Sequence, residues 1–172
     1  MFETALILFF PFLMAYAAAS DLVSMTISNR ISLVLMAVFV LFAWLIGMNL
    51  TDFAWHWAMF ALVLFGGFAL FAAGVIGGGD AKLAACAGLW LGWENALSYF
   101  TLSAVIGGVL TILIIKIRAT PLPDRVQRIG WVARLYRADE GIPYGIALGF
   151  AAILVYPNTV WMEHVFELAH RL

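Results

Sequence analysis

The longest apolar stretch of the chain spans residues 53–76 and reads FAWHWAMFALVLFGGFALFAAGVI. It contains no Asp, Glu, Lys or Arg, and it exceeds the roughly 20 residues that a helix needs to cross the hydrocarbon core of a bilayer. The stretch stops abruptly, because Gly77-Gly78-Gly79-Asp80 follows at once. These residues predict a membrane span that ends in a flexible, acidic turn.

The rest of the 172-residue chain has the same character, with 65% hydrophobic and only 11% charged residues. A soluble domain of this size needs many more charges to cover its surface. Apolar stretches recur at residues 4–20, 31–48, 53–76, 81–93, 96–115 and 142–161, and none alternates as a barrel strand would. We predict an all-α membrane protein, a single domain over residues 1–172 with a bundle of about six transmembrane helices. The fourth stretch would reach only about 20 Å, so we expect it to be tilted or longer than it looks.

The distribution of basic residues predicts the orientation. With six spans, every Lys and Arg except Arg171 falls in connections on one side of the membrane, which the positive-inside rule makes cytoplasmic. Both termini are then outside the cytoplasm. No Lys or Arg precedes the first apolar run, so we expect this run to be a retained span rather than a signal peptide.

Residues 120–140 form the one long connection, between spans five and six. We predict a basic amphipathic helix on the cytoplasmic surface that binds anionic lipid, with a solvated connector as the alternative. Asp124 would be the N-cap of this helix, and Trp131 would lie at the headgroups. Its apolar positions would be Val126, Ile129, Val132, Ala133 and Tyr136. Its basic positions would be Arg125, Arg128, Arg134 and Arg137. Near the C-terminus, an apolar stripe predicts an interfacial cap on the outer face, made by Trp161, Val165, Leu168 and Leu172.

Two aspartates end predicted spans on the same side. Asp21 ends the first span and Asp80 ends the third, so both would lie at the cytoplasmic boundary. Two carboxylates that approach each other cannot both ionise; one then accepts a proton from water while the other donates one to a substrate carbonyl. Alternatively, each is an ordinary helix-end residue among the headgroups. The pair favours general acid and base catalysis.

Three motifs resemble those of one known family. Gly77-Gly78-Gly79-Asp80, continued by Lys82-Leu83, resembles the Gly-x-Gly-Asp motif of membrane aspartyl peptidases in the form found in type IV prepilin peptidases. Asp21 followed by Ile27-Ser28-Asn29 is similar to that family's first-aspartate motif, with Ser28 in place of the usual proline. Pro143-Tyr144-Gly145 resembles a third family element.

The resemblance implies catalysis by Asp21 and Asp80 on a pilin precursor, in the bacterial inner membrane, with cleavage after a glycine where the basic leader meets the hydrophobic helix. Larger members also methylate the new N-terminus and carry a zinc-binding domain with paired Cys-x-x-Cys motifs. This chain has a single cysteine, Cys86, and no room for that domain after Asp21. It resembles the short, peptidase-only branch that serves tight-adherence pili, and we predict neither a metal nor a methyl donor.

The supporting residues have two interpretations each. Gly77, Gly78 and Gly79 would admit a substrate backbone beside Asp80, or form a simple break between spans. Lys82 would bind the substrate or lower the pKa of an aspartate, or anchor the span at the headgroups. Asn29 would hydrogen-bond within the Asp21 loop or cap span two. Pro143, Tyr144 and Gly145 would shape the cleft, with helix packing through Gly145 and Gly149 as the alternative. His56, between two tryptophans, predicts an outer aromatic belt, with a metal ligand as the alternative.

Other function classes fit less well. A net charge of −1 argues against a nucleic-acid partner, because phosphate binding needs a concentrated basic face. A small proton-coupled transporter would need acids near the middle of a span, and no predicted span has one. A structural membrane subunit would leave the aspartate motifs unexplained. The sequence leaves the oligomeric state open.

Overall fold

The computed structural model describes residues 2–121, 128–137 and 139–170, and every regular element within these ranges is a helix. The elements are α1 (Phe2–Ser24), α2 (Asn29–Leu45), α3 (Leu50–Ala72), α4 (Gly78–Leu91), α5 (Ala96–Arg118), α7 (Gly130–Tyr136), α8 (Gly145–Val155), the 3-10 helix η1 (Tyr156–Asn158) and α9 (Val160–Ala169). The predicted all-α fold is confirmed for this part of the chain.

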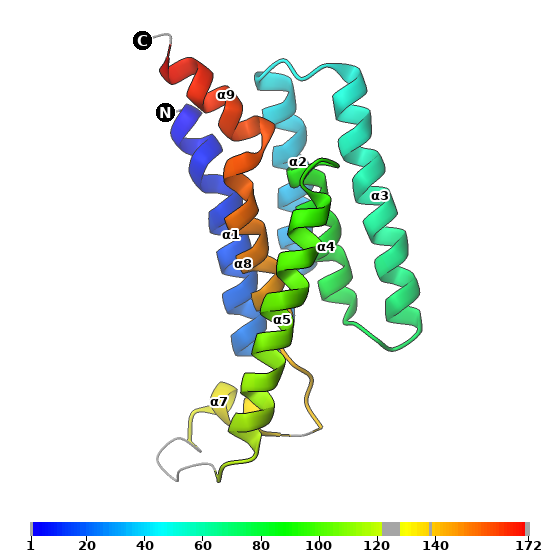
Figure 1. The fold of residues 1–172 in the computed structure, drawn as a ribbon, viewed down its shortest axis with the longest axis vertical. Coiled ribbons are helices and arrows are strands. Elements are labelled where there is room, and N and C mark those ends of the chain that lie inside the picture. Colours follow the sequence, from blue (N-terminus) through cyan, green and yellow to red (C-terminus); the bar gives the residue numbers. More distant parts are fainter. Residues whose placement is uncertain (1, 122–127, 138, 171–172) are drawn as a thin grey trace.

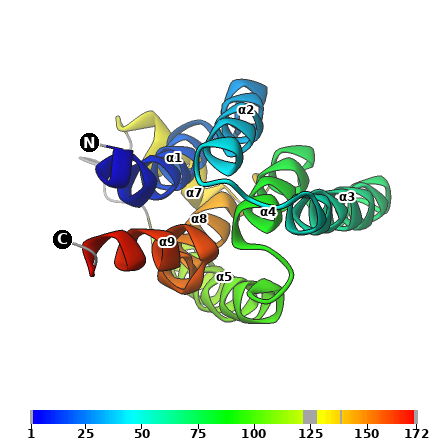
Figure 2. The same cartoon turned by 90° about the horizontal axis from the view of Figure 1, so that it is seen from above.

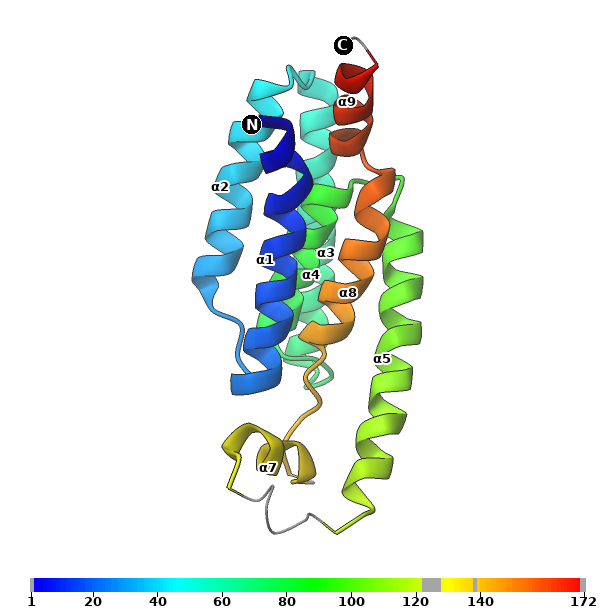
Figure 3. The ribbon, with the colours of Figure 1, turned by 90° about the vertical axis from the view of Figure 1, so that its left-hand side faces the viewer.

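The long helices stand side by side as a bundle, and the two ends of the chain lie at the same end of it (Figures 1 and 3). We call this the terminus end. The opposite end carries the last turn of α1, the first turns of α4 and α8, and the short helix α7 (Figure 3). We call it the aspartate end, because Asp21 and Asp80 lie in those turns of α1 and α4.

The short helix α4 lies in the middle of the bundle, where it contacts α2, α3, α5 and α8 (Figure 2). Every residue from Ala81 to Leu91 is buried except Lys82, which is half-buried. Small side chains allow this close packing; a side chain at Gly67 of α3 would come within 2.9 Å of the Ala81 Cβ. The fourth apolar stretch is therefore a helix enclosed by protein, and it begins three residues earlier than predicted.

Three helices are long and apolar enough to cross a membrane: Glu3–Ser24, Leu50–Ala72 and Ala96–Arg118. A bent pair, residues 145–158 with α9, makes a fourth if it counts as one span. The outward faces of α3 and α5 are rich in exposed apolar side chains, such as Phe65 at 73% and Val109 at 63% exposure, which suits lipid rather than water. These observations indicate a membrane protein, whereas six full spans stay a prediction.

The last predicted span, 142–161, is wrong as a single helix. The helix α8 begins at Gly145 and ends at Val155, and after η1 the chain continues as α9 at an angle of 41°. The break falls at Thr159, whose backbone is extended (φ −99°, ψ 160°) and which is the N-cap residue of α9.

The predicted interfacial cap at the C-terminus is also wrong in part. Trp161 and Val165 of α9 are buried in the core, and the Trp161 indole donates a hydrogen bond of 2.8 Å to the Trp90 carbonyl. The Trp90 ring stacks on Phe10 of α1 at a centroid distance of 5.1 Å, and its own N–H bonds the Leu35 carbonyl at 3.0 Å. The stripe faces protein because α9 folds back against α1. Leu172 lies outside the described residues.

His56 does not belong to a lipid-facing aromatic belt. It is 7% exposed, its Nδ1 is 2.6 Å from the Leu89 carbonyl, and its ring closely approaches Gly92. A side chain at Gly92 would come within 2.9 Å of the imidazole. His56 is therefore a core residue that joins α3 to the end of α4.

The 120–140 segment is helical over Gly130–Tyr136 only, within its described part. The predicted N-cap Asp124, together with Arg125 and Val126, lies outside the described residues. Arg134 donates a hydrogen bond of 2.6 Å to the Val23 carbonyl at the end of α1, so this basic side chain contacts protein. Binding of anionic lipid stays a prediction.

Candidate active site

Asp21 lies in the last turn of α1 and is 6% exposed. The helix ends three residues later, where Met25 has a left-handed φ of 53° and its N–H bonds the Asp21 carbonyl at 2.8 Å. The backbone N–H of Gly145, at the start of α8, donates a hydrogen bond of 2.8 Å to Asp21 Oδ2. A Cβ at residue 145 would lie 2.8 Å from the same oxygen, so glycine is required for this contact. The Pro143-Tyr144-Gly145 motif thus orients the Asp21 carboxylate.

Asp80 lies in the first turn of α4 and is half-buried. Gly77 is the N-cap residue of this helix, and a Cβ there would lie 2.9 Å from Asp80 Oδ2. Gly79 packs against Ile27, where a Cβ would lie 3.2 Å from the Ile27 side chain. The glycines therefore bring the loop after Asp21 against the turn that carries Asp80.

A hydrogen bond joins the two aspartate motifs directly. Lys82 Nζ donates to Asn29 Oδ1 at 2.9 Å, across 53 residues of sequence. The prediction that Asn29 caps α2 is wrong, because the Ser28 hydroxyl accepts the Arg30 N–H and is the cap. Ser28 stands where the family motif has proline, so this departure supplies the cap for α2.

The two carboxylates influence each other. Asp80 does not belong to any of the three helices that are long enough to cross a membrane. Its pKa is raised to about 6, mainly by burial and secondly by the negative charge of Asp21. A hydrogen bond from the Gly77 backbone partly opposes the rise. Two carboxyl groups coupled in this way titrate as a pair that holds one proton over an intermediate pH range. Such a pair has an acid and a base ready at the same time.

Tyr144 and Arg118 hold the segment that leads into Gly145. The Tyr144 hydroxyl donates to the Ser103 carbonyl of α5 at 3.4 Å, and the absent side chain of Gly107 leaves room for the tyrosine ring. The Arg118 guanidinium, at the end of α5, donates to the Leu135 carbonyl of α7 at 2.7 Å, and to the Glu140 and Gly141 carbonyls of the α7–α8 connection at 2.9 and 3.0 Å. Sequence reasoning missed Arg118, Ser103 and Gly107 as supports of the site, because an arginine at a span end and small residues within a span are common anyway.

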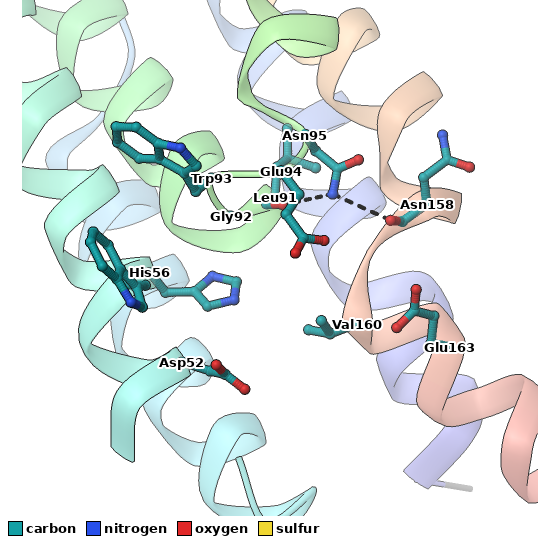
Figure 4. A pocket seen from close by; sticks show the side chains of 11 residues that line it. Asp52, His56, Leu91, Gly92, Trp93, Glu94, Asn95, Asn158, Val160 and Glu163 are labelled. Carbon is teal, nitrogen blue, oxygen red and sulfur yellow. Dashed lines mark hydrogen bonds between the residues drawn. The ribbon is translucent and has the colours of Figure 1, made fainter. Parts of the chain in front are cut away.

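The terminus end has a separate cavity of about 440 Å³ (Figure 4). Its lining includes three carboxylates, those of Asp52 in α3, Glu94 in the turn between α4 and α5, and Glu163 in α9, together with His56. This cavity is at the opposite end of the bundle from Asp21 and Asp80. No three His, Cys, Asp or Glu side chains lie close enough to hold a metal ion in the ranges that the structure covers.

Comparison with known proteins defines the class to which this fold and site belong. Residues 8–112 match the type IV leader peptidase family, a match that covers more than half of the chain and includes Asp21, Asp80, Asn29 and Lys82. The chain therefore belongs to the type IV leader peptidase family, a family of peptidases. No curated protein matches the sequence, and no solved structure matches the fold.

Proposed function

We propose that this protein is an aspartic endopeptidase that removes the short leader of type IV pilin precursors at the cytoplasmic boundary of the bacterial inner membrane. One observation carries the proposal. The loop that follows Asp21 and the turn that holds Asp80 pack together, and the Lys82–Asn29 hydrogen bond joins them. Family membership supports the peptidase activity, and the raised pKa of Asp80 supports the roles given below.

In this mechanism the pair starts with one proton, on Asp80. We assign the ionised role to Asp21 because the Gly145 N–H donates a hydrogen bond to its carboxylate, and the protonated role to Asp80 because the pKa of Asp80 is raised to about 6. Asp21 takes a proton from a water molecule as the water oxygen attacks the carbonyl carbon of the scissile peptide bond. Asp80 donates its proton to the carbonyl oxygen, which gives a neutral tetrahedral diol. The diol collapses when one hydroxyl returns its proton to Asp80 and the amine leaves with the proton held by Asp21.

The orientation follows from the basic residues of the described chain. All of these residues lie at the aspartate end, near the starts of α2 and α4, at the end of α5, or in and beside α7. They are Arg30, Lys82, Lys116, Arg118, Arg128, Arg134 and Arg137. We assign this aspartate end to the cytoplasm and the terminus end to the outside. A pilin precursor whose basic leader stays in the cytoplasm would then present its leader junction at the level of Asp21 and Asp80.

Membranes that contain the protein and a pilin precursor test the proposal. The wild type is expected to release the leader, and Asp21→Asn and Asp80→Asn are each expected to lower the rate at least about 10³-fold, because each lacks one member of the acid–base pair. Asp52→Asn, an acid at the terminus end, is the matched control and should cleave at the wild-type rate. Cleavage by both aspartate variants at the wild-type rate, with normal insertion, would overturn the proposal.

A further inference from the structure

The cavity at the terminus end has a buried imidazole that points into it. His56 of α3 is 7% exposed, and its ring lines the cavity of about 440 Å³ (Figure 4). Its Nδ1 lies 2.6 Å from the Leu89 carbonyl oxygen. A carbonyl oxygen can only accept a hydrogen bond, so Nδ1 carries the ring proton. The other nitrogen, Nε2, is then an acceptor in the neutral imidazole.

The Nε2 atom of His56 is held in place without a partner. It makes no hydrogen bond within the described part of the chain, and it is not sealed off by protein, so a ligand in the cavity can reach it. The Leu89 carbonyl fixes one side of the ring, and Gly92 packs against the other. A Cβ at Gly92 would lie 2.9 Å from the ring Cε1 and 3.4 Å from Nε2. This fixed acceptor is therefore ready for a donor that enters the cavity.

Three carboxylates surround the same space. Asp52, Glu94 and Glu163 come from three separate parts of the fold, all three are exposed, and they line the cavity that His56 enters (Figure 4). Within the described residues, Glu94 and Glu163 have no hydrogen bond or ion pair, and only the Asn49 amide bonds the Asp52 carboxylate. None of the residues known to line the cavity is Lys or Arg. The cavity therefore has a negative potential that the protein itself leaves uncompensated.

The size and lining of the cavity define the class of ligand. A volume of about 440 Å³ is typical of a site for a small organic molecule, and the described acids do not converge as metal ligands would. The rings of Trp55 and Trp93, with centroids 6.3 Å apart, add apolar surface to the lining. A fitting ligand has several positive charges, N–H donors and an apolar chain between them.

We propose that this cavity binds a soluble organic cation with two or more ammonium groups, such as a linear polyamine. One ammonium group donates a hydrogen bond to His56 Nε2 inside the cavity. Another pairs with Glu94 and Glu163 at the rim, and the methylene chain packs on the tryptophan rings. Lipid headgroups with an ammonium group also carry a phosphate, which the three carboxylates repel, so we assign the site to a soluble ligand.

Isothermal titration calorimetry of the full-length protein in a nonionic detergent at low salt tests the inference, with hexamethylenediamine as the probe. The wild type is expected to bind the diamine saturably. Glu94→Gln and Glu163→Gln should each raise Kd about tenfold, because each keeps the side-chain shape but loses a charged acceptor. Glu167→Gln is the matched control, since Glu167 is exposed one turn further along α9 and outside the cavity lining. Its Kd should stay within about twofold of the wild-type value.

A second ligand tests the role of the imidazole without changing the protein. Hexamethonium has the same chain length and charge as the diamine, but its nitrogens are fully methylated and have no N–H to donate. It should bind at least about tenfold more weakly, because His56 Nε2 then receives no hydrogen bond. Equal affinities for the two cations would show only diffuse attraction to an acidic surface and would overturn the proposal.

Three further results would also overturn it. These are the absence of saturable binding to the wild type, an equal rise of Kd in the Glu167→Gln control, and weaker diamine binding in phosphatidylethanolamine nanodiscs than in phosphatidylcholine nanodiscs. The last result would show that a lipid headgroup occupies the cavity. No pilin precursor takes part in these measurements, so a failure here leaves the proposed peptidase function untouched.

Discussion

The two ends of the helical bundle are built on different principles. At the terminus end, large aromatic side chains stack around Trp90, and buried polar atoms of Trp161 and Tyr156 are matched to backbone carbonyls. At the aspartate end, glycines replace the large side chains, and hydrogen bonds connect loops that are far apart in sequence, as between Lys82 and Asn29. The terminus end holds the helices together, whereas the aspartate end holds the two carboxylates in place. Substitutions at the aspartate end should therefore change rates more than stability.

Gly145→Ala is expected to have the largest effect among substitutions that leave both aspartates in place. Its new Cβ would lie 2.8 Å from Asp21 Oδ2 and would displace the carboxylate from the Gly145 N–H. A displacement of about 1 Å at a reacting group can cost about 10²-fold in rate. Leader cleavage by membranes that hold equal amounts of each protein measures the effect.

Gly108→Ala is the control for this prediction, because a Cβ at Gly108 of α5 would meet nothing within 4 Å. It should cleave at the wild-type rate, and a small gain in helix stability is expected. Equal rates for the Gly145 and Gly108 variants would show that the contact with Asp21 has no catalytic consequence.

The pH dependence should show an alkaline limit set by the aspartate pair. The pKa of Asp80 is raised to about 6, so its donor proton is present below that pH and is lost as the pH rises through it. Once the pH exceeds the higher apparent pKa of the pair, kcat should fall about tenfold per pH unit. Single-turnover cleavage at a series of pH values from about 5 to about 9 measures the profile. At all of these pH values an ordinary Asp carboxyl, with a pKa of about 4, is ionised. A rate that keeps rising to pH 9 would contradict a proton held by Asp80.

The smallest of these effects is expected at the bond that joins the two motifs. Lys82→Met and Asn29→Ala each remove the 2.9 Å contact, which is partly open to solvent, so each should lower the cleavage rate several-fold. The double variant should be no worse than either single one, because the same bond is lost. Lys116→Met, a lysine at the end of α5, serves as the control. Fully additive losses would mean that Lys82 and Asn29 act separately.

Much of the candidate site was predictable from the sequence, because its residues occur in short motifs. Asp21, Asp80 and Gly145 each follow or begin an apolar stretch, and the alternation of spans places all three at one end. The contacts among them were not predictable. That the Gly145 N–H meets Asp21, or that Lys82 meets Asn29, depends on how α1, α4 and α8 pack together.

The errors in the predicted fold have physical reasons. His56 and Trp161 occur near span ends, where an aromatic belt and an aromatic core have the same composition, and only the packing of α9 distinguishes the two. The break of the last span had a signal, since Pro157-Asn158 interrupts it, but apolar residues on both sides concealed the break. The length of the fourth apolar stretch predicts a helix too short to cross the bilayer. The enclosure of this helix, α4, by α2, α3, α5 and α8 depends on tertiary packing, which the sequence does not reveal.

The central claim is that Asp21 and Asp80 form one site, and cysteine cross-linking tests it without a substrate. Cys86 is the single cysteine of the sequence, so Cys86→Ala gives a background free of thiols. Asp21→Cys and Asp80→Cys are then combined in one chain and treated in membranes with a short reagent that joins two thiols. The pair Asn29→Cys with Lys82→Cys is the positive control, because these side chains are in contact.

The negative control combines Asp52→Cys, from the terminus end, with Asp80→Cys. Cross-linking between positions 21 and 80 within one chain, with none between 52 and 80, is the result that this account predicts. Efficient cross-linking of the positive control but none between positions 21 and 80 would contradict it, because the two carboxyl groups would then be too far apart to act on one peptide bond.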